Sequence, residues 1–262
     1  MDWFFYLHPV WQAFIATIFT YMITALGASV VFLFKSVNQK FLDIMMGVSA
    51  GVMIAASYWS LLEPGISLSE ELDQNAALMV ASGFILGGVF IICSDLFLGR
   101  SIKNKTYEKG YKRCVLLVTA VTMHNIPEGL AVGVAFGNAG QQMGGAGFIG
   151  AVMLAVGIGI QNFPEGTCVA MPLRREGNSR LKSFIVGQFS GMVEPVAGVI
   201  GALFALYVQQ ALPMALAFSA GAMISVVCSE LIPESFRDNK NLATCGILVG
   251  FVVMMVLDVS LG

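Results

Sequence analysis

The sequence His124-Asn125-Ile126-Pro127-Glu128-Gly129 recurs 37 positions later as Gln161-Asn162-Phe163-Pro164-Glu165-Gly166. Each copy lies in the middle of an apolar stretch of membrane-spanning length and places a carboxylate and amide or imidazole side chains around a proline. Ionisable side chains at membrane depth are costly, and by default they mark a pathway or a ligand site. Two copies on neighbouring segments therefore predict one site built by both.

The composition identifies an integral membrane protein. Of the 262 residues, 57% are apolar and 11% are charged, and the mean hydropathy is +0.80, whereas a soluble domain carries roughly 25% charged residues. The apolar runs are about 20 residues long or longer, which is the length of a transmembrane helix rather than of a barrel strand. We predict an all-α chain with eight spans, at about 10–34, 41–62, 76–98, 112–137, 146–173, 181–208, 211–233 and 242–261.

The basic residues predict the orientation of these spans. All 14 fall in four loops that share one side of an eight-span arrangement, and both termini and the other three loops contain none. By the positive-inside rule, the basic side is cytoplasmic and both termini lie outside. The outer loop after span two holds Glu70, Glu71 and Asp73 without a basic residue, and it is either an ordinary solvated loop or a cation-attracting vestibule.

Spans one to three are predicted to repeat as spans six to eight. The segment 49–54 matches 219–224 at an offset of 170, which also pairs Phe19 with Phe189. An offset of 163 pairs Asp95 in span three with Asp258 in span eight. Because an odd number of spans separates equivalent starts, the second copy is inverted, as in many secondary transporters with a midplane site. The chain is thus predicted to be one transmembrane domain, 1–262, in a 3+2+3 arrangement: repeat one about 10–98, a central helix pair about 112–173, and inverted repeat two about 181–261.

The spacing of the polar residues in the two motifs predicts a metal site. Residues three or four apart share a helix face. Glu128 therefore shares a face with His124 and Asn125, and Glu165 shares a face with Gln161 and Asn162. Imidazole suits zinc and iron, and oxygen ligands suit harder divalent cations, while a bound cation relieves the repulsion between buried carboxylates. The donors exceed the needs of one ion and predict two adjacent sites that share both glutamates. The candidate ligands are His124, Asn125, Glu128, Gln161, Asn162, Glu165, Glu194 and Met53.

Each of these residues also has an ordinary structural interpretation. A single Pro-Glu-Gly sequence describes a helix end or turn, Glu194 can be a neutral acid bonded to a neighbour, and Met53 can be a core residue. Three glutamates lie near span ends and are either solvated or line an entrance (Glu63) and an exit (Glu230 and Glu234). The five cysteines form no CxxC pair and indicate neither a disulfide framework nor a zinc finger.

At these residues the chain resembles the ZIP family of divalent metal transporters over essentially its whole length, and Gln161 and Glu194-Pro195 resemble the GufA-like branch. The resemblance implies a binuclear centre, and members carry zinc, iron, manganese or cadmium into the cytoplasm, commonly by sliding one helix bundle against another. It implies one metal held by His124, Glu128, Gln161 and Glu165 with Met53 approaching, and a second held by Asn125, Glu128, Asn162, Glu165 and Glu194. Position 162 is Asn where some close relatives have Asp, which removes a charge from the second site.

We therefore expect a non-enzymatic transporter of divalent metal, foremost zinc uptake toward the cytoplasm by alternating access. Zn²⁺ is the expected cargo, with Fe²⁺, Mn²⁺ and Cd²⁺ as alternatives, and no catalytic residue or resident cofactor is expected. The expected partners are metal ions and the lipid bilayer, with no nucleic acid; a homodimer is one open oligomeric state, and the expected location is the plasma (inner) membrane. Two alternatives are a passive divalent-cation channel and an intramembrane metal-dependent hydrolase, whose HExxH pattern the motif does not fit.

Overall fold

The computed structural model describes residues 2–33, 39–103, 109–140 and 145–261; within these ranges the side chains of residues 2, 95, 98–103, 109–117, 120, 123, 124, 145, 146, 209 and 261 are outside the description. All secondary structure in these ranges is helical, as the length of the apolar runs predicts. The side chains of His124 and Asp95, both singled out from the sequence, lie outside the described residues.

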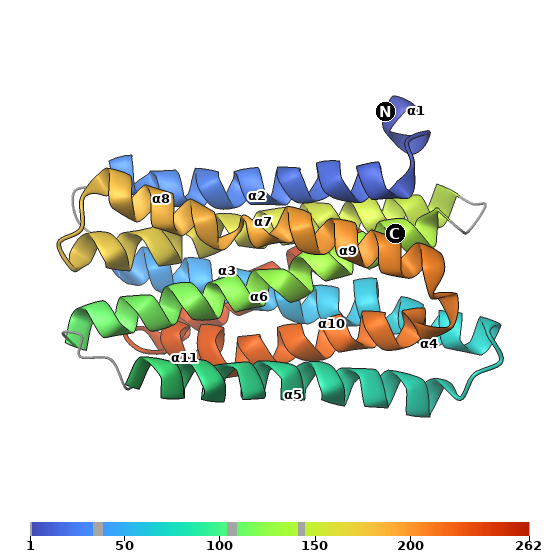
Figure 1. The fold of residues 1–262 in the computed structure, drawn as a ribbon. Coiled ribbons are helices and arrows are strands. Elements are labelled where there is room, and N and C mark those ends of the chain that lie inside the picture. Colours follow the sequence, from blue (N-terminus) through green and yellow to red (C-terminus); the bar gives the residue numbers. More distant parts are fainter. Residues whose placement is uncertain (1, 34–38, 104–108, 141–144, 262) are drawn as a thin grey trace.

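The helices follow one another along the chain with short connections (Figure 1). Their bounds are α1 (Asp2–Phe5), α2 (Pro9–Leu33), α3 (Gln39–Ala56), η1 (Ser57–Leu62), α4 (Glu63–Glu71), α5 (Ala76–Lys103), α6 (Lys109–Ala139), α7 (Gly145–Arg175), α8 (Arg180–Ser190), α9 (Val193–Tyr207), η2 (Gln209–Ala211), α10 (Leu212–Val226), η3 (Val227–Leu231), α11 (Ile232–Ser235) and α12 (Lys240–Leu261).

Seven helical segments of the described chain are long and apolar enough to cross a membrane, which makes this an integral, multi-pass membrane protein. They are Pro9–Leu33, Gln39–Glu71, Ala76–Ser94, Gly147–Arg175, Arg180–Tyr207, Leu212–Ser235 and Lys240–Ser260. Helix α6, the predicted fourth span, is not among the seven, and its first nine side chains are outside the description. Figure 1 marks both chain ends toward the same end of the bundle.

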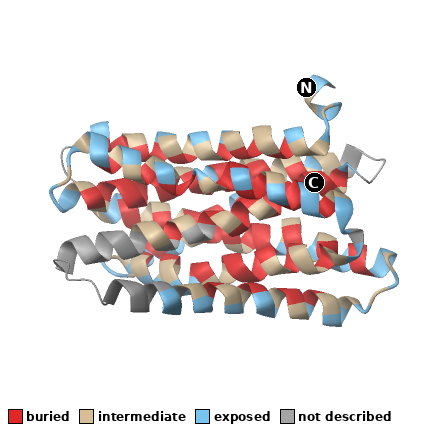
Figure 2. Ribbon diagram, in the orientation of Figure 1, coloured by how far each residue is buried: buried red, intermediate tan, exposed pale blue. Residues whose placement is uncertain are grey.

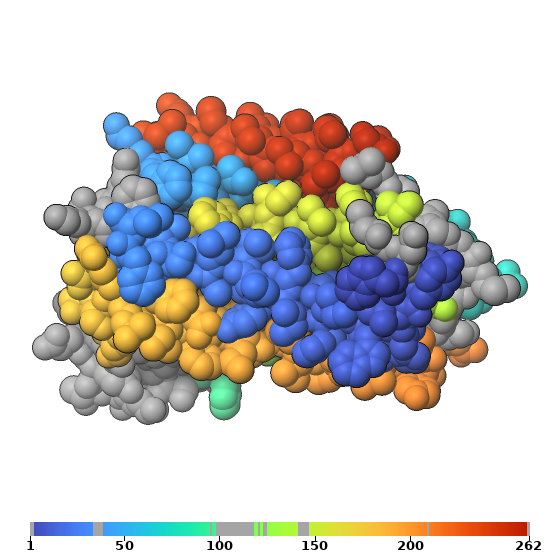
Figure 3. Space-filling view, turned by 90° about the horizontal axis from the view of Figure 1, so that it is seen from above, coloured from blue at the N-terminus to red at the C-terminus, as the bar shows by residue number. Residues whose placement is uncertain are grey.

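The helices pack as two groups. In the first helix group α2 packs against α7, and α6 against α9; in the second helix group α3 packs against α12, and α5 against α10. The two groups meet where α3 packs on α7 and α10 packs on α6. Figure 3 shows part of this order on one face, from α12 through α3, α7 and α2 to α8 and α9. Each predicted repeat therefore contributes its first span to the group that holds α6 and α7, rather than keeping all three spans together.

Contacts at equivalent positions of the predicted repeats recur. Gly51 on α3 lies against the backbone of Ile247 on α12, and Gly221 on α10 lies against the backbone of Phe84 on α5. These contacts exchange under the two sequence offsets, because positions 51 and 221 differ by 170 and positions 84 and 247 by 163. Glycine permits this approach of two backbones, as in other closely packed membrane helices.

Exposed residues lie on the outward faces of the bundle (Figure 2), and many of them are large apolar side chains. On α5 and α12 the exposed side chains are aliphatic along most of each helix, as lipid contact requires, while buried residues gather between the helices. The exposed aliphatic side chains include Leu78, Ile85, Ile92, Leu248, Val252 and Val259.

Three local features differ from the sequence expectation. The predicted sixth span is broken, because α8 ends at Ser190 and α9 begins at Val193. The predicted acidic loop after span two is largely helical, since α4 extends to Glu71. Spans two and seven each contain a π-helical turn, η1 and η3, just before Pro64 and Pro233, whose missing N–H groups interrupt regular α-helical bonding.

Candidate metal centre

The first motif lies on α6, which continues through Pro127 without a break. Asn125 and Glu128 are both fully buried. They are three residues apart and so share one face of the helix. The side chain of His124, on the same helix, is not described, so its predicted ligand role stays a prediction.

The second motif lies on α7, which likewise continues through Pro164. Gln161 and Asn162 are fully buried, and Glu165 is 4% exposed. Gln161 and Glu165 are four residues apart and share a face. The side-chain amide of Gln161 donates a hydrogen bond to Oε1 of Glu128, which joins the two motifs directly across the α6–α7 contact.

Glu194 is held by groups from two other helices. Asn162 Nδ2 on α7 donates to both carboxylate oxygens, at 2.9 Å to Oε1 and 3.1 Å to Oε2. The Thr20 hydroxyl on α2 also donates to Oε2. Glu194 lies in the first turn of α9, where the helix dipole favours negative charge. The break between α8 and α9 therefore places a carboxylate beside the second motif.

The two motif asparagines make matching contacts. Asn125 Nδ2 donates to the backbone oxygen of Ser190 at 2.8 Å, and Asn162 Nδ2 donates to the backbone oxygen of Thr20 at 3.2 Å. Positions 20 and 190 differ by the repeat offset of 170, so Thr20 and Ser190 could have been found from the sequence by extending the alignment that pairs Phe19 with Phe189. Sequence reasoning missed both.

The three amide side chains of the cluster share one feature. Each donates its NH₂ group to a protein acceptor, and each leaves its carbonyl oxygen buried without a hydrogen-bond partner among the described residues: Asn125 Oδ1, Gln161 Oε1 and Asn162 Oδ1. Buried oxygens without a donor are costly in a protein interior. These three oxygens belong to residues beside buried carboxylates, which makes them candidate ligands for a cation.

The described side chains contain no group of three or more His, Cys, Asp or Glu that could hold a metal. The cluster depends on amides in place of further carboxylates. Met53 is fully buried on α3, the helix of the second group that packs against α7. Its thioether role stays a prediction.

Comparison with known proteins shows the family. A family model described as ZIP Zinc transporter matches residues 103–258, which contain both motifs and Glu194. The chain belongs to the ZIP family.

Relatives in the ZIP family cover nearly the whole chain. Zinc transporter ZIP11 from Bos taurus is 38% identical, over 97% of this chain and 98% of the relative. Zinc transporter GufA from Myxococcus xanthus is 37% identical, over 91% and 94%, and Zinc transporter ZIPB from Bordetella bronchiseptica is 34% identical, over 91% and 78%. The predicted resemblance to the ZIP family and to GufA is confirmed, and these relatives are named as transporters rather than enzymes.

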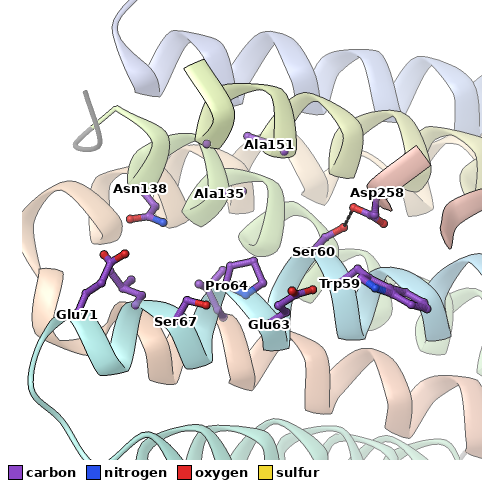
Figure 4. A pocket seen from close by; sticks show the side chains of 14 residues that line it. Trp59, Ser60, Glu63, Pro64, Ser67, Glu71, Ala135, Asn138, Ala151 and Asp258 are labelled. Atoms are coloured by element: carbon purple, nitrogen blue, oxygen red, sulfur yellow. Dashed lines mark hydrogen bonds between the residues drawn. The ribbon is translucent and has the colours of Figure 1, made fainter. Parts of the chain in front are cut away.

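This ZIP-family chain has a polar pocket of about 420 Å³ near the C-terminal end of α6 (Figure 4). Its acidic lining residues are Glu63 and Glu71 on α4 and Asp258 on α12, and α6 contributes Asn138. Ser60 Oγ donates to Asp258 Oδ1 at 2.8 Å across it. Ala135 also lines the pocket and is seven residues from Glu128, about 10 Å along the helix. None of the candidate ligands is among the lining residues, so the pocket ends short of the polar cluster.

Proposed function

We propose that this chain carries zinc across a membrane through two metal positions built on α6 and α7. The observation that carries the proposal is the set of three buried amide oxygens left without donors beside Glu128 and Glu194. Their amide nitrogens already bond the protein, which orients the oxygens as ligands before a cation arrives. The zinc transporters of the ZIP family that this chain resembles point to zinc as the cargo.

The two positions would share the carboxylates of the motifs. The first would be held by His124, Glu128, Gln161 and Glu165, with Met53 approaching from α3. The second would be held by Asn125, Glu128, Asn162, Glu165 and Glu194. Support for this division is the chain of contacts from Glu128 through Gln161 on one side, and from Asn162 to Glu194 on the other.

The proposed topology has eight spans, with α6 as the fourth, both termini outside and a 3+2+3 arrangement with inverted repeats. The exchanged glycine contacts of α3–α12 and α5–α10 support the inversion. So do the matching hydrogen bonds of Asn125 and Asn162, whose partners are equivalent residues of spans one and six. All 14 basic residues would then lie in the cytoplasm.

Alternating access would come from movement of the first helix group against the second. The hydrogen bonds that join the polar cluster run among α2, α6, α7, α8 and α9, so the two metal positions would travel as one unit. The pocket of Glu63, Glu71 and Asp258 is lined by both groups and would be the outer entrance. Uptake toward the cytoplasm, at the plasma membrane, is the direction that we propose.

Uptake of radiolabelled zinc into proteoliposomes tests this function. We expect saturable uptake by the wild-type protein and its loss in Glu128→Ala and Glu165→Ala, since each would remove a ligand shared by both positions. Glu176→Ala, at an exposed acidic residue just after α7, is the matched control and should transport normally. Normal uptake by either motif variant would refute the site, and flux that never saturates would favour a channel.

A further inference from the structure

An apolar groove lies at the seam between the two helix groups. It has a volume of about 290 Å³ and is lined by α6 and α9 of the first group and by α5 and α10 of the second. Leu86, Ile200 and Phe204 line it and are 51%, 55% and 38% exposed, so the groove opens on the outside of the bundle. All of its described lining residues except Ser219 are apolar or glycine, and the Ser219 hydroxyl already donates to the backbone oxygen of Ala215 at 3.2 Å.

The groove follows from the way in which the small residues of these helices are used. On α6, Gly129, Gly133 and Gly137 all lie against α9, and on α10 Gly221 lies against the backbone of α5. Glycine lets two membrane helices approach closely. The described glycines of α6 and α10 therefore tighten each group within itself, and larger side chains line the seam between the groups.

The length and position of the groove match one leaflet of a bilayer. Its lining includes Ala211 in η2, close to the exposed Tyr207, which ends an apolar span and is of a residue type enriched at the membrane–water interface. From Ala211 to Ser219 the helical rise is about 12 Å, and the hydrocarbon of one leaflet is about 15 Å thick. On α6 the lining reaches Leu130, two residues from Glu128. The groove thus runs from the interface to the level of the proposed metal centre.

We propose that this groove binds one acyl chain of a phospholipid from the leaflet at the Tyr207 end, and that the bound chain stabilises the two helix groups in the arrangement that the structure describes. An unfilled groove loses the dispersion contacts that its walls could make, and a flexible hydrocarbon chain supplies them without leaving a polar group unpaired. The described lining residues carry no charge, which favours the chain over the headgroup as the bound part.

The effect of the chain on transport rests on the proposed function, because movement of one helix group against the other would reshape a groove whose walls belong to both. Binding of the chain does not depend on that function.

A second copy of this chain is the alternative occupant. A stable contact between two proteins buries roughly 800 Å² on each partner, which is far more surface than a recess of about 290 Å³ offers. One acyl chain needs no surface beyond the groove itself.

Photo-crosslinking with a phosphatidylcholine that carries a diazirine in one acyl chain tests the site. The purified protein in detergent is titrated with this lipid, and the labelled residues are identified by mass spectrometry. We expect saturable labelling of the groove lining on α9 and α10, which unlabelled phosphatidylcholine competes away. Ala215→Phe fills the groove and Ile200→Asn places an amide in it, and each should reduce this labelling by roughly tenfold.

Two variants at exposed positions outside the groove lining are the matched controls. Val249→Phe on α12 and Val196→Asn on α9 should be labelled in the groove as wild type is. Thermal melting checks that each variant is folded.

Zinc uptake into phosphatidylcholine proteoliposomes tests the effect on transport. Ala215→Phe should lower the maximal rate by about fivefold or more, the lower end of typical coupling between two sites. The zinc concentration for half-maximal uptake should not change, because Ala215 is not a candidate ligand. Val249→Phe should transport as wild type does.

Several results would overturn the proposal. Labelling spread evenly over the exposed faces of α5, α9 and α12, or groove labelling that persists in folded Ala215→Phe and Ile200→Asn, would refute the acyl-chain site. A dimeric protein without label in the groove would assign the groove to a second copy. Wild-type maximal uptake by an Ala215→Phe variant that is no longer labelled would refute the effect on transport. Absence of wild-type uptake would refute the proposed function itself, while the labelling would still decide whether the groove binds lipid.

Discussion

Replacement of Asn162 by leucine tests how the cluster is held together before metal binds. Asn162 Nδ2 bonds both oxygens of Glu194 and the backbone oxygen of Thr20, so Asn162→Leu removes donors from a buried carboxylate. Hydrogen bonds to a charged group contribute about 1.5–3 kcal/mol each and are not additive, so we expect a loss of about 2–4 kcal/mol in the free energy of unfolding. Asn125→Leu is the matched variant, because Asn125 occupies the equivalent place and donates one bond to the neutral oxygen of Ser190. It should cost only about 0.5–1.5 kcal/mol.

Unfolding of the metal-free protein in detergent, followed by circular dichroism, measures both losses. Zinc is then added to each variant, and the increase in melting temperature reports the remaining affinity. Both variants lose one amide oxygen of the proposed second position and should gain less stability from zinc than wild type does. Equal metal-free stability of Asn162→Leu and wild type would refute the account of Glu194 as a carboxylate held by Asn162.

Further predictions concern packing, entrance and topology. Gly51→Ala should lower the free energy of unfolding by about 1–3 kcal/mol, because a Cβ would overlap the backbone of Ile247. Gly150→Ala, whose Cβ meets nothing within 4 Å, should raise it by up to about 1 kcal/mol. Equal shifts of the two variants in a melting assay would contradict the packing. Glu63→Gln should raise the zinc concentration for half-maximal uptake by roughly two- to tenfold, with a smaller effect at high salt, because Glu63 lines the pocket proposed as the entrance. A reduced maximal rate at saturating zinc would instead indicate a role in later steps. A cysteine placed at Gln210 should react with an impermeant thiol reagent from outside intact cells, and one at Gly177 should react only after permeabilisation; the reverse pattern would overturn the orientation.

Most of the helices and much of the candidate site could be predicted from the sequence, because both depend on residues that are close together along the chain. The apolar runs give bounds within a few residues for α2 and α7, and the helical spacing places Asn125, Gln161 and Glu165 in buried positions, as the structure has them. The internal offsets relate contacts that the structure repeats, such as those of Gly51 and Gly221.

The remaining features depend on contacts between distant segments. The break after α8 places Gly191 against the side chain of Thr24, a neighbour far away in sequence. The division into two helix groups follows from which surfaces pack together, and hydropathy does not contain that information. The sequence alone did not indicate a role for Thr20, because a threonine in an apolar span commonly bonds the backbone of its own helix. In the structure its hydroxyl also donates to Glu194.

A crystal structure of the protein grown with zinc, with anomalous scattering recorded at the zinc absorption edge, tests the central claim most directly. The account predicts two anomalous peaks between α6 and α7, with the side chains of Glu128 and Glu165 each contacting both ions. A single ion, or zinc bound only away from these two glutamates, would contradict it.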